Sequence, residues 1–226
     1  MPSSSGANGR GRRVGLTRDQ IVDAAVALID RDGLDAFSLR RLAADIGVDP
    51  MSLYNHVANK DALFDGVVEV VMAEIGAAMG DLTGPWPDQI RQAAAAFRGV
   101  LLGHPHVSVI VLTRPVLSDV PLEVLRRAVN PALDAGLPFD EAVLLLRTFT
   151  SFLTGAILRE LGSAMTFGAL TPERVAARVV EIESSGEPLL AEAATVVASI
   201  DHERLFTYGV ELLIAGLTAT LGEPGR

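Results

Sequence analysis

The stretch "GVDPMSLYNHV", residues 47–57, decides the fold because it joins a turn, a helix cap and a short helix. Gly47 suits the end of a helix, since glycine readily adopts the left-handed conformation that closes many helices. Asp49 is a capping residue, and Pro50 then stands at the first helical position, where a missing N–H costs nothing. The stretch therefore predicts a tight glycine turn followed by a helix over about 50–56.

The expected helix has two different faces. Leu53 and Val57 lie one helical turn apart, so both are expected to point into a small core. The residues that must then point away from this core are Pro50, Met51, Tyr54 and Asn55. An ordinary core helix would not place so many polar groups in so few residues, so the outer face is a candidate binding surface.

Capping residues and apolar spacing place the other helices. Thr17 and Gln20 have the spacing of a capping box, which starts a helix, and Ser38 and Asn59 are further caps. Apolar residues recur every three or four positions behind the caps, as they do on one face of a helix. The expected helices span 18–31, 39–46, 50–56, 60 to about 79, 88–103, 105–112, 119–135, 139–161, 172–184, 187–199 and 202–221.

The pattern along the chain predicts an all-α fold with two helical domains. Alternating strand patterns, phosphate-binding glycine loops and long internal repeats are all missing from the sequence. The Pro- and Gly-rich stretch "DLTGPWPDQ", residues 81–89, is the clearest boundary. It divides the chain into a disordered tail over 1–15, a three-helix helix-turn-helix domain over 16–80 and a larger helical domain over 81–226.

The formal net charge of −9 is unevenly distributed. Residues 1–60 hold eight Lys and Arg against seven Asp, a net charge of +1, and the other residues carry −10. The N-terminal part is therefore free to approach an anion. The chain has no cysteine, which excludes disulfides and thiolate metal sites. Because it shows no signal-peptide pattern and its unbroken apolar runs are short, we expect a cytoplasmic protein that does not contact a membrane.

A short capped helix with an exposed polar face fits the DNA major groove, which is about 12 Å wide. Its first residues would reach base edges, while Tyr54, His56 and Lys60 carry donors for phosphate oxygens. Arg40 and Arg41 begin the preceding helix, where one of them could also meet the groove. The motif by itself leaves an alternative open, which is that this helix merely closes an ordinary helical domain.

Over residues 17–74 the chain resembles the N-terminal domain of the TetR family of transcriptional regulators. The motifs "FSLRRLA" (37–43) and "LYNHVANKDAL" (53–63) follow the family's order and spacing. The resemblance implies double-stranded operator DNA as a partner. The positions that touch the operator in the family are Arg40, Pro50, Met51, Ser52, Tyr54, Asn55, His56 and Lys60. Asn55 stands where the family's founding member has Trp, so the operator sequence does not carry over.

Residues 111–160 are similar to the tetracycline-repressor subgroup of that family, through a Thr-Arg-Pro step and the helix around Gly155. In the subgroup the drug enters as a metal chelate held by a His and an acidic residue. The corresponding positions here are Ile110 and Arg159, which cannot ligate Mg²⁺. Glu160 is a poor substitute because it faces another direction on its helix. We therefore expect neither a bound metal nor recognition of a metal–tetracycline chelate.

An apolar cavity in the C-terminal domain is the remaining ligand hypothesis. Such a cavity with a few polar groups suits a mostly hydrophobic small-molecule inducer. The candidate residues are His104, His106, Ile110, Arg114, Arg147, Phe149, Ser151, Phe152, Arg159 and Met165. Apolar residues at helical spacing are also what any helical core requires, so the core interpretation stays open. The pair of histidines in "HPH" (104–106) lacks a third metal ligand at a recognisable spacing.

By the same resemblance, helices near 139–161 and 202–221 of two subunits form a four-helix homodimer interface, with burial inside one subunit as the alternative. The sequence contains no catalytic triad order and no HExxH motif, so we expect no catalytic residue, no cofactor and no enzyme activity. The expected function is a homodimeric repressor released from a palindromic operator by a small-molecule inducer. The rival is a helical small-molecule-binding protein or enzyme whose N-terminal unit is only an interaction module.

Overall fold

The computed structural model describes residues 16–114, 118–165, 172–184, 189 and 201–222. These residues form α-helices joined by turns and contain no strand, which confirms the all-α fold class. The expected tail over 1–15 and nearly all of the expected helix over 187–199 lie outside the described residues.

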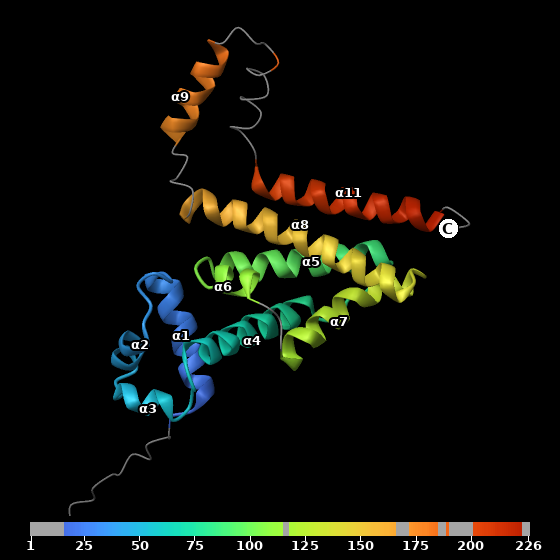
Figure 1. Ribbon diagram of the computed structural model, residues 1–226. Helices are drawn as coiled ribbons and strands as arrows, with labels where there is room; N and C mark the ends of the chain where they lie inside the picture. Colours follow the sequence, from blue (N-terminus) through green and yellow to red (C-terminus); the bar gives the residue numbers. More distant parts are fainter. Residues whose placement is uncertain (1–15, 115–117, 166–171, 185–188, 190–200, 223–226) are drawn as a thin grey trace, which may run out of the picture. The chain divides into compact units, whose positions relative to one another are not determined.

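The helices lie close to where the sequence predicts them (Figure 1). They are α1 (Arg18–Asp32), α2 (Leu39–Asp45), α3 (Pro50–Tyr54), α4 (Lys60–Met79), α5 (Trp86–Gly103), α6 (Ser108–Thr113), α7 (Asp119–Asp134), α8 (Phe139–Met165), α9 (Pro172–Glu183) and α11 (His202–Gly222). The helix expected from residue 105 begins at Ser108, because residues 105–107 form a turn. α8 continues past 161 through Gly162, which a helix tolerates at a cost of up to about 1 kcal/mol.

The chain divides into two compact units, residues 1–66 (unit 1) and residues 67–226 (unit 2). The division falls inside α4, so this one continuous helix carries residues of both units. Each unit is compact in itself.

The four expected caps are all present in unit 1. In each, a side-chain oxygen accepts a hydrogen bond from a backbone N–H two or three residues further on, which satisfies a donor that the helix leaves unpaired. The pairs are Thr17 with Gln20 (3.2 Å), Ser38 with Arg41 (3.2 Å), Asp49 with Met51 (2.8 Å) and Asn59 with Ala62 (2.8 Å). These caps set where α1, α2, α3 and α4 begin.

Two glycines shape unit 1. Gly47 has φ +73°, the left-handed conformation that the turn between α2 and α3 requires. Gly66 brings α4 against α1, because a Cβ at this position would lie 2.8 Å from Cγ2 of Val22. Fully buried residues of this unit include Ile21, Val22, Leu28, Ile29, Leu42, Leu53 and Leu63. This small core holds the three helices of the predicted helix-turn-helix domain.

Unit 2 is a bundle in which α8 packs against α5, α7 and α11. α8 and α11 lie side by side and run in opposite directions (Figure 1). Their common core is apolar and includes Ile90, Val129, Phe149, Leu153, Phe206 and Val210. In addition, α5 packs against α7 and α11, so each of these four helices buries one face against at least two others.

Arginine side chains connect the helices of unit 2 at the edges of this core. Arg98 on α5 holds Glu160 on α8 through two hydrogen bonds of 2.7 and 3.1 Å, and both side chains are largely shielded from solvent. Arg127 on α7 donates to the backbone carbonyl oxygens of Gly76 and Gly80, at the C-terminal end of α4. These donors satisfy carbonyl groups that the end of a helix leaves unpaired.

Two helices, α8 over Phe139–Gly162 and α11 over His202–Leu221, are long and apolar enough to cross a membrane by length and composition. The sequence analysis considered only unbroken apolar runs, whereas these two helices carry polar residues between their apolar ones. Only 22% of the most apolar stretch of each helix is buried within the chain. A core helix of a water-soluble protein meets the same criterion, so the observation chiefly identifies apolar surface on α8 and α11.

Candidate nucleic-acid interface and small-molecule cavity

α3 is a five-residue helix with an inner and an outer face. Leu53 is 1% exposed and Val57 is 4% exposed, which confirms that both face the core. Met51 is 70% exposed and Tyr54 is 49% exposed on the opposite side. The helix ends at Tyr54 rather than near 56, because the N–H groups of His56 and Val57 both donate to the carbonyl oxygen of Leu53 at 2.9 Å. The outer face therefore consists of α3 and the turn that follows it.

All eight candidate DNA-contacting residues lie in unit 1 and are at least partly accessible to solvent. Pro50, Asn55 and His56 are exposed beside Met51 and Tyr54, and Ser52 is half-buried. Arg40 near the start of α2 and Lys60 at the start of α4 are also exposed. The structure thus supplies these residues from α2, α3, the turn after α3 and α4, and their contact with DNA stays a prediction.

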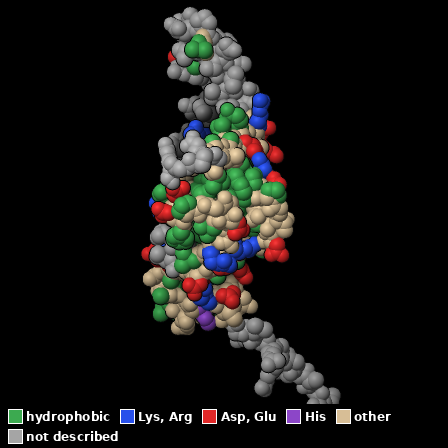
Figure 2. Space-filling model, turned by 90° about the vertical axis from the view of Figure 1, so that its right-hand side faces the viewer, with side chains coloured by type: hydrophobic (Ala, Val, Ile, Leu, Met, Phe, Trp, Pro, Cys, Tyr) green, Lys and Arg blue, Asp and Glu red, His purple; other side chains and the backbone are tan. Residues whose placement is uncertain are grey.

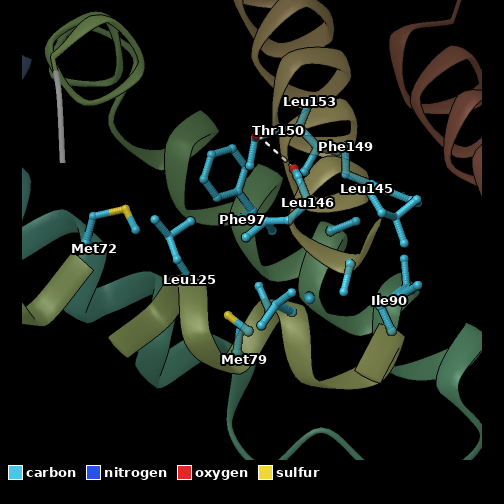
Figure 3. Close-up of a pocket in the computed structure, with 16 residues that line it drawn as sticks. Met72, Met79, Ile90, Phe97, Leu125, Leu145, Leu146, Phe149, Thr150 and Leu153 are labelled. Carbon is cyan, nitrogen blue, oxygen red and sulfur yellow. Dashed lines mark hydrogen bonds between the residues drawn. The ribbon is translucent and has the colours of Figure 1, made fainter. Parts of the chain in front are cut away.

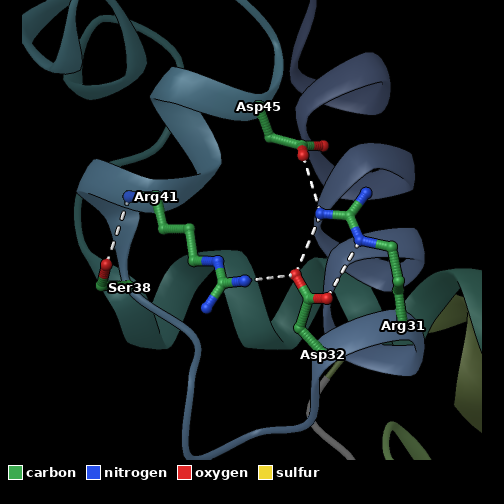
Figure 4. A network of polar contacts seen from close by, with 5 residues as sticks. All are labelled: Arg31, Asp32, Ser38, Arg41 and Asp45. Carbon is green, nitrogen blue, oxygen red and sulfur yellow. Dashed lines mark hydrogen bonds and ion pairs between the residues drawn. The ribbon is translucent and has the colours of Figure 1, made fainter.

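An ion-pair network joins α2 to the end of α1 (Figure 4). Asp32 accepts hydrogen bonds from Arg31 at 3.0 and 3.1 Å and from Arg41 at 2.9 Å, and Arg31 also reaches Asp45 at 2.8 Å. The hydrogen bonds from Arg31 lower the pKa of Asp32 below its ordinary value of 3.8. Arg41 is therefore occupied by Asp32, whereas Arg40 makes no ion pair with the residues that the structure describes. Of the two arginines, Arg40 is the one available to a nucleic acid.

A cavity of about 80 Å³ lies within unit 2 (Figure 3). It is larger than the roughly 10–15 Å³ that one water molecule needs. The lining residues are Met72 and Met79 of α4, Ile90, Ala93, Ala94 and Phe97 of α5, Leu125, Ala128, Val129 and Ala132 of α7, and Ala142, Leu145, Leu146, Phe149, Thr150 and Leu153 of α8. Thr150 is the one polar side chain in this lining, and its hydroxyl donates to the carbonyl oxygen of Leu146 at 2.9 Å. The cavity therefore suits an apolar molecule and offers a charged group no partner.

The structure places Phe149, alone among the candidate ligand residues, in the lining of this cavity. Arg147, Ser151 and Arg159 are exposed on α8. The candidates whose side chains are described but lie outside the lining are His104, His106, Ile110, Arg114, Arg147, Ser151, Phe152 and Arg159. The side chain of Met165 lies outside the described part of the chain.

Sequence reasoning missed the walls of the cavity that α4, α5 and α7 supply. Residues such as Met72, Phe97 and Leu125 follow the same helical spacing as the residues of a filled core. No signal in the sequence separates a residue that lines a void from one that fills it. Only the separation of the four helices in space makes the distinction.

The two positions that would correspond to metal-chelate ligands hold no oxygen donor. Ile110 is 3% exposed and apolar, and Arg159 is an exposed cation. Glu160 is engaged by Arg98, and His104 Nε2 lies 2.8 Å from Oε2 of Glu74. Within the described ranges no three His, Asp or Glu side chains are grouped so that they could hold a metal ion.

Apolar side chains remain uncovered on α8 and α11. Leu144 on α8 is 63% exposed, and Tyr208 and Leu212 on α11 are 63% and 55% exposed. Figure 2 looks onto the end of unit 2 where α8 begins and α11 ends, and hydrophobic side chains gather there with charged side chains around them. Exposed apolar patches rimmed by charge are typical of protein–protein interfaces.

Family models match most of the chain. Residues 21–67 match the model described as "Bacterial regulatory proteins, tetR family". Residues 80–221 match the model described as "Tetracyclin repressor-like, C-terminal domain". Together these ranges include the candidate nucleic-acid interface, the cavity lining apart from Met72 and Met79, and the uncovered faces of α8 and α11.

Individual relatives span nearly the whole chain. An HTH-type transcriptional regulator of Saccharopolyspora erythraea is 32% identical over 92% of this chain and 86% of its own length. The tetracycline repressor protein class E of Escherichia coli is 28% identical over 92% of this chain and 93% of its own. The crystal structure of the TetR family protein ActR of Streptomyces coelicolor in complex with actinorhodin is similar with a TM-score of 0.79 and 29% identity, covering 92% of this chain and 99% of that one.

Proposed function

We propose that this chain, which belongs to the TetR family of bacterial transcriptional regulators, is a homodimeric repressor that a mostly hydrophobic small molecule releases from a palindromic operator. Members of this family are DNA-binding helix-turn-helix regulators and not enzymes, so the prediction of a non-enzymatic regulator is confirmed. The rival interpretation, in which the N-terminal unit is only an interaction module, is excluded by the same membership.

The outward face of α3 is the observation that carries the DNA-binding part of the proposal. Its buried Leu53 anchors the helix, so the exposed Met51 and Tyr54 are held in a fixed orientation. In a homodimer, two such helices related by a twofold axis enter successive major grooves about 34–36 Å apart, which requires a palindromic operator. Residues 16–80 would form the DNA-binding domain, and the protein would act in the cytoplasm, where bacterial DNA lies.

A gel-shift titration tests DNA binding. The probe is the duplex upstream of the protein's own gene, and an unrelated duplex of equal length is the control. We expect specific binding that weakens steeply as salt rises, because each phosphate contact releases bound counterions. Equal affinity for the two duplexes would contradict the proposal. A reporter gene placed behind the bound duplex then separates repression, which lowers expression, from activation, which raises it.

The cavity in unit 2 supports a ligand that is mostly hydrophobic. Its lining contains a single hydroxyl and no charged side chain. A charged molecule would lose its hydration here without gaining a partner, whereas an apolar molecule has little hydration to lose. The similar ActR structure holds actinorhodin, which supports an organic ligand for a regulator of this fold. A thermal-shift screen of neutral and charged compounds tests the class, and we expect stabilisation by neutral apolar members.

We further propose that the ligand is not a metal–tetracycline chelate. Ile110 and Arg159 stand at the two positions where a His and an acidic residue would be needed, and neither ligates Mg²⁺. We expect tetracycline to bind no better with Mg²⁺ than without it. Micromolar, magnesium-dependent binding in a fluorescence titration would contradict this expectation.

The uncovered apolar faces of α8 and α11 support dimerisation through these helices. A stable protein interface usually buries an apolar patch of this kind, and a four-helix arrangement of two α8 and two α11 helices would cover both faces. Sedimentation at micromolar concentration tests the assembly. We expect twice the mass of the chain, and a monomer would contradict the proposal.

Release by ligand requires a difference in affinity between two states. A ligand that weakens operator binding 100-fold must favour the release-competent state by about 2.7 kcal/mol. α4 is a candidate for transmitting this difference, because the same helix carries Lys60 at its start and the cavity residues Met72 and Met79 near its end. By reciprocity, operator DNA must weaken ligand binding by the same factor, which a ligand titration with and without DNA measures.

A further inference from the structure

Lys60 is the single lysine of the chain, since all other basic residues are arginine or histidine. Its ammonium nitrogen, Nζ, lies 5.1 Å from the centre of the Phe64 ring and 5.4 Å from the centre of the Phe37 ring. The two rings are 5.5 Å apart and tilted by 43° to each other. Both distances are within the roughly 6 Å over which a cation is attracted to an aromatic face.

The rings are fixed by the fold, whereas the ammonium group stays at the surface. Phe64 follows Lys60 by one turn on α4, and Phe37 directly precedes Ser38, the cap of α2. Phe37 is 6% and Phe64 is 9% exposed, while Lys60 is exposed. Lys60 forms no ion pair with a carboxylate in the described part of unit 1, so none of these carboxylates neutralises its charge.

We propose that Phe37 and Phe64 are positioning residues that hold the Lys60 ammonium ready to contact a DNA phosphate. The inference rests on the proposed DNA-binding function. A free lysine side chain loses rotamer freedom when it binds, and the aromatic contact removes part of that loss in advance. The attraction to the rings uses the charge of the ammonium group but leaves N–H donors for a phosphate oxygen. The start of α4 adds a partial positive charge at the same place.

The competing explanation is that Lys60 simply covers two rings with its aliphatic stem, as many surface lysines do. In that case, replacing a ring by an aliphatic side chain would change the stability of unit 1 but not the contribution of Lys60 to DNA binding. The two explanations therefore differ in whether the effects of ring and lysine substitutions on affinity are coupled.

A double-mutant cycle measures this coupling in the full-length protein. The probe is a 30-base-pair duplex that the unmodified protein selects from a random-sequence pool. We expect Lys60→Met to weaken binding about tenfold, and Phe64→Leu or Phe37→Leu to weaken it about threefold when Lys60 is present. In the Lys60→Met background the Phe→Leu effect should vanish. Leu28→Val, a core substitution in the same unit, should lower the melting temperature without changing affinity.

Two further measurements separate positioning from stability. Lys60→Met should reduce the magnitude of the slope of log affinity against log salt concentration by about 0.9 for each lysine–phosphate contact that is lost. The Phe→Leu variants should change the slope in the same direction. Phe64→Tyr keeps an aromatic face and should restore both affinity and slope. Because the chain has one lysine, isotope-labelled lysine gives a single side-chain ε-methylene signal in NMR. Ring currents should shift that signal upfield, and Phe64→Leu should return it to the ordinary lysine position.

The outcomes distinguish failure of the proposed DNA-binding function from failure of the proposed role of Phe37 and Phe64. If the unmodified protein selects no duplex, the proposed function fails, and this inference fails with it. If it selects a duplex but the Phe→Leu effect persists in the Lys60→Met background, or the lysine signal is not shifted, the inference alone is overturned. Should Phe64→Leu fail to fold, Phe37→Leu and the lysine signal of the unmodified protein still decide the matter.

Discussion

Gly209 on α11 lies so close to the ring of Phe152 on α8 that a Cβ at residue 209 would overlap the ring. Gly209→Ala should therefore destabilise the protein, although alanine favours a helix by about 1 kcal/mol over glycine. Overpacking against a ring costs about 1–3 kcal/mol, so we expect a net loss of up to about 2 kcal/mol in the free energy of unfolding. Urea denaturation measures it.

Matched substitutions check this explanation. Gly216 lies on the same helix, and a Cβ added there would meet no described atom of the chain within 4 Å, so Gly216→Ala lacks the overlap within one subunit. Phe152→Leu should recover much of the loss in the Gly209→Ala background, because it removes the overlapping ring. If Gly209→Ala is as stable as the unchanged protein, the close approach is not a constraint.

The Arg31–Asp32–Arg41 network predicts an acid-dependent contribution to stability. The pKa of Asp32 is lower in the folded state than its ordinary value of 3.8. Asp32 therefore contributes to stability at a pH above its unfolded-state pKa, and this contribution is lost as the pH falls through its folded-state pKa. Asp32→Asn should lower the melting temperature at pH 7, and the difference from the unchanged protein should disappear well below pH 3.8. Thermal unfolding between pH 7 and 2 tests this, and a difference that does not change with pH would contradict it.

Arg40 and Arg41 are neighbours with different expected roles. Arg40 is exposed and forms no ion pair with a described residue, whereas Arg41 is held by Asp32 at 2.9 Å. Arg40→Ala should weaken operator binding and reduce the salt slope by about 0.9 for each phosphate that the arginine neutralises. Arg41→Ala should chiefly lower the melting temperature. Fluorescence anisotropy at several salt concentrations measures binding and thermal unfolding measures stability, and a larger binding defect for Arg41→Ala would reverse the assignment.

The uncovered face of α11 predicts that a charge there breaks the dimer. Leu212 is 55% exposed, and Leu212→Glu would bury a carboxylate in the proposed interface at a cost of several kcal/mol. Sedimentation should then detect monomers. Leu122 on α7 is 50% exposed and lies on neither α8 nor α11, so Leu122→Glu should leave the dimer intact. Equal behaviour of the two variants would place the interface elsewhere.

Filling the cavity should separate ligand binding from DNA binding. Ala128 lines the cavity from α7, and Ala128→Leu places a larger apolar side chain there. We expect at least roughly tenfold weaker binding of any compound found in the thermal-shift screen, with unchanged operator affinity in the absence of ligand. Isothermal titration measures the first and a gel shift the second. A ligand that binds the variant normally would have its site outside this cavity.

The helix-turn-helix could be derived almost completely from the sequence. Thr17, Ser38, Asp49 and Asn59 cap the helices where they were expected, because a cap is a local interaction between residues two or three apart. The orientation of α3 followed from the spacing of its apolar residues for the same reason. Family membership was likewise visible in residues that are close together in the chain.

The cavity and the pairing of charges depended on the tertiary structure. The cavity residues come from α4, α5, α7 and α8, and only the distance between those helices decides whether Phe97 or Leu125 lines a void or fills a core. In the same way, the family resemblance named Arg40, but only the structure shows that Asp32 at the end of α1 holds the neighbouring Arg41. Local spacing therefore determined the helices, their caps and their exposed faces, whereas the partners of side chains distant in sequence were decided by packing, because such pairs form only once the helices have come together.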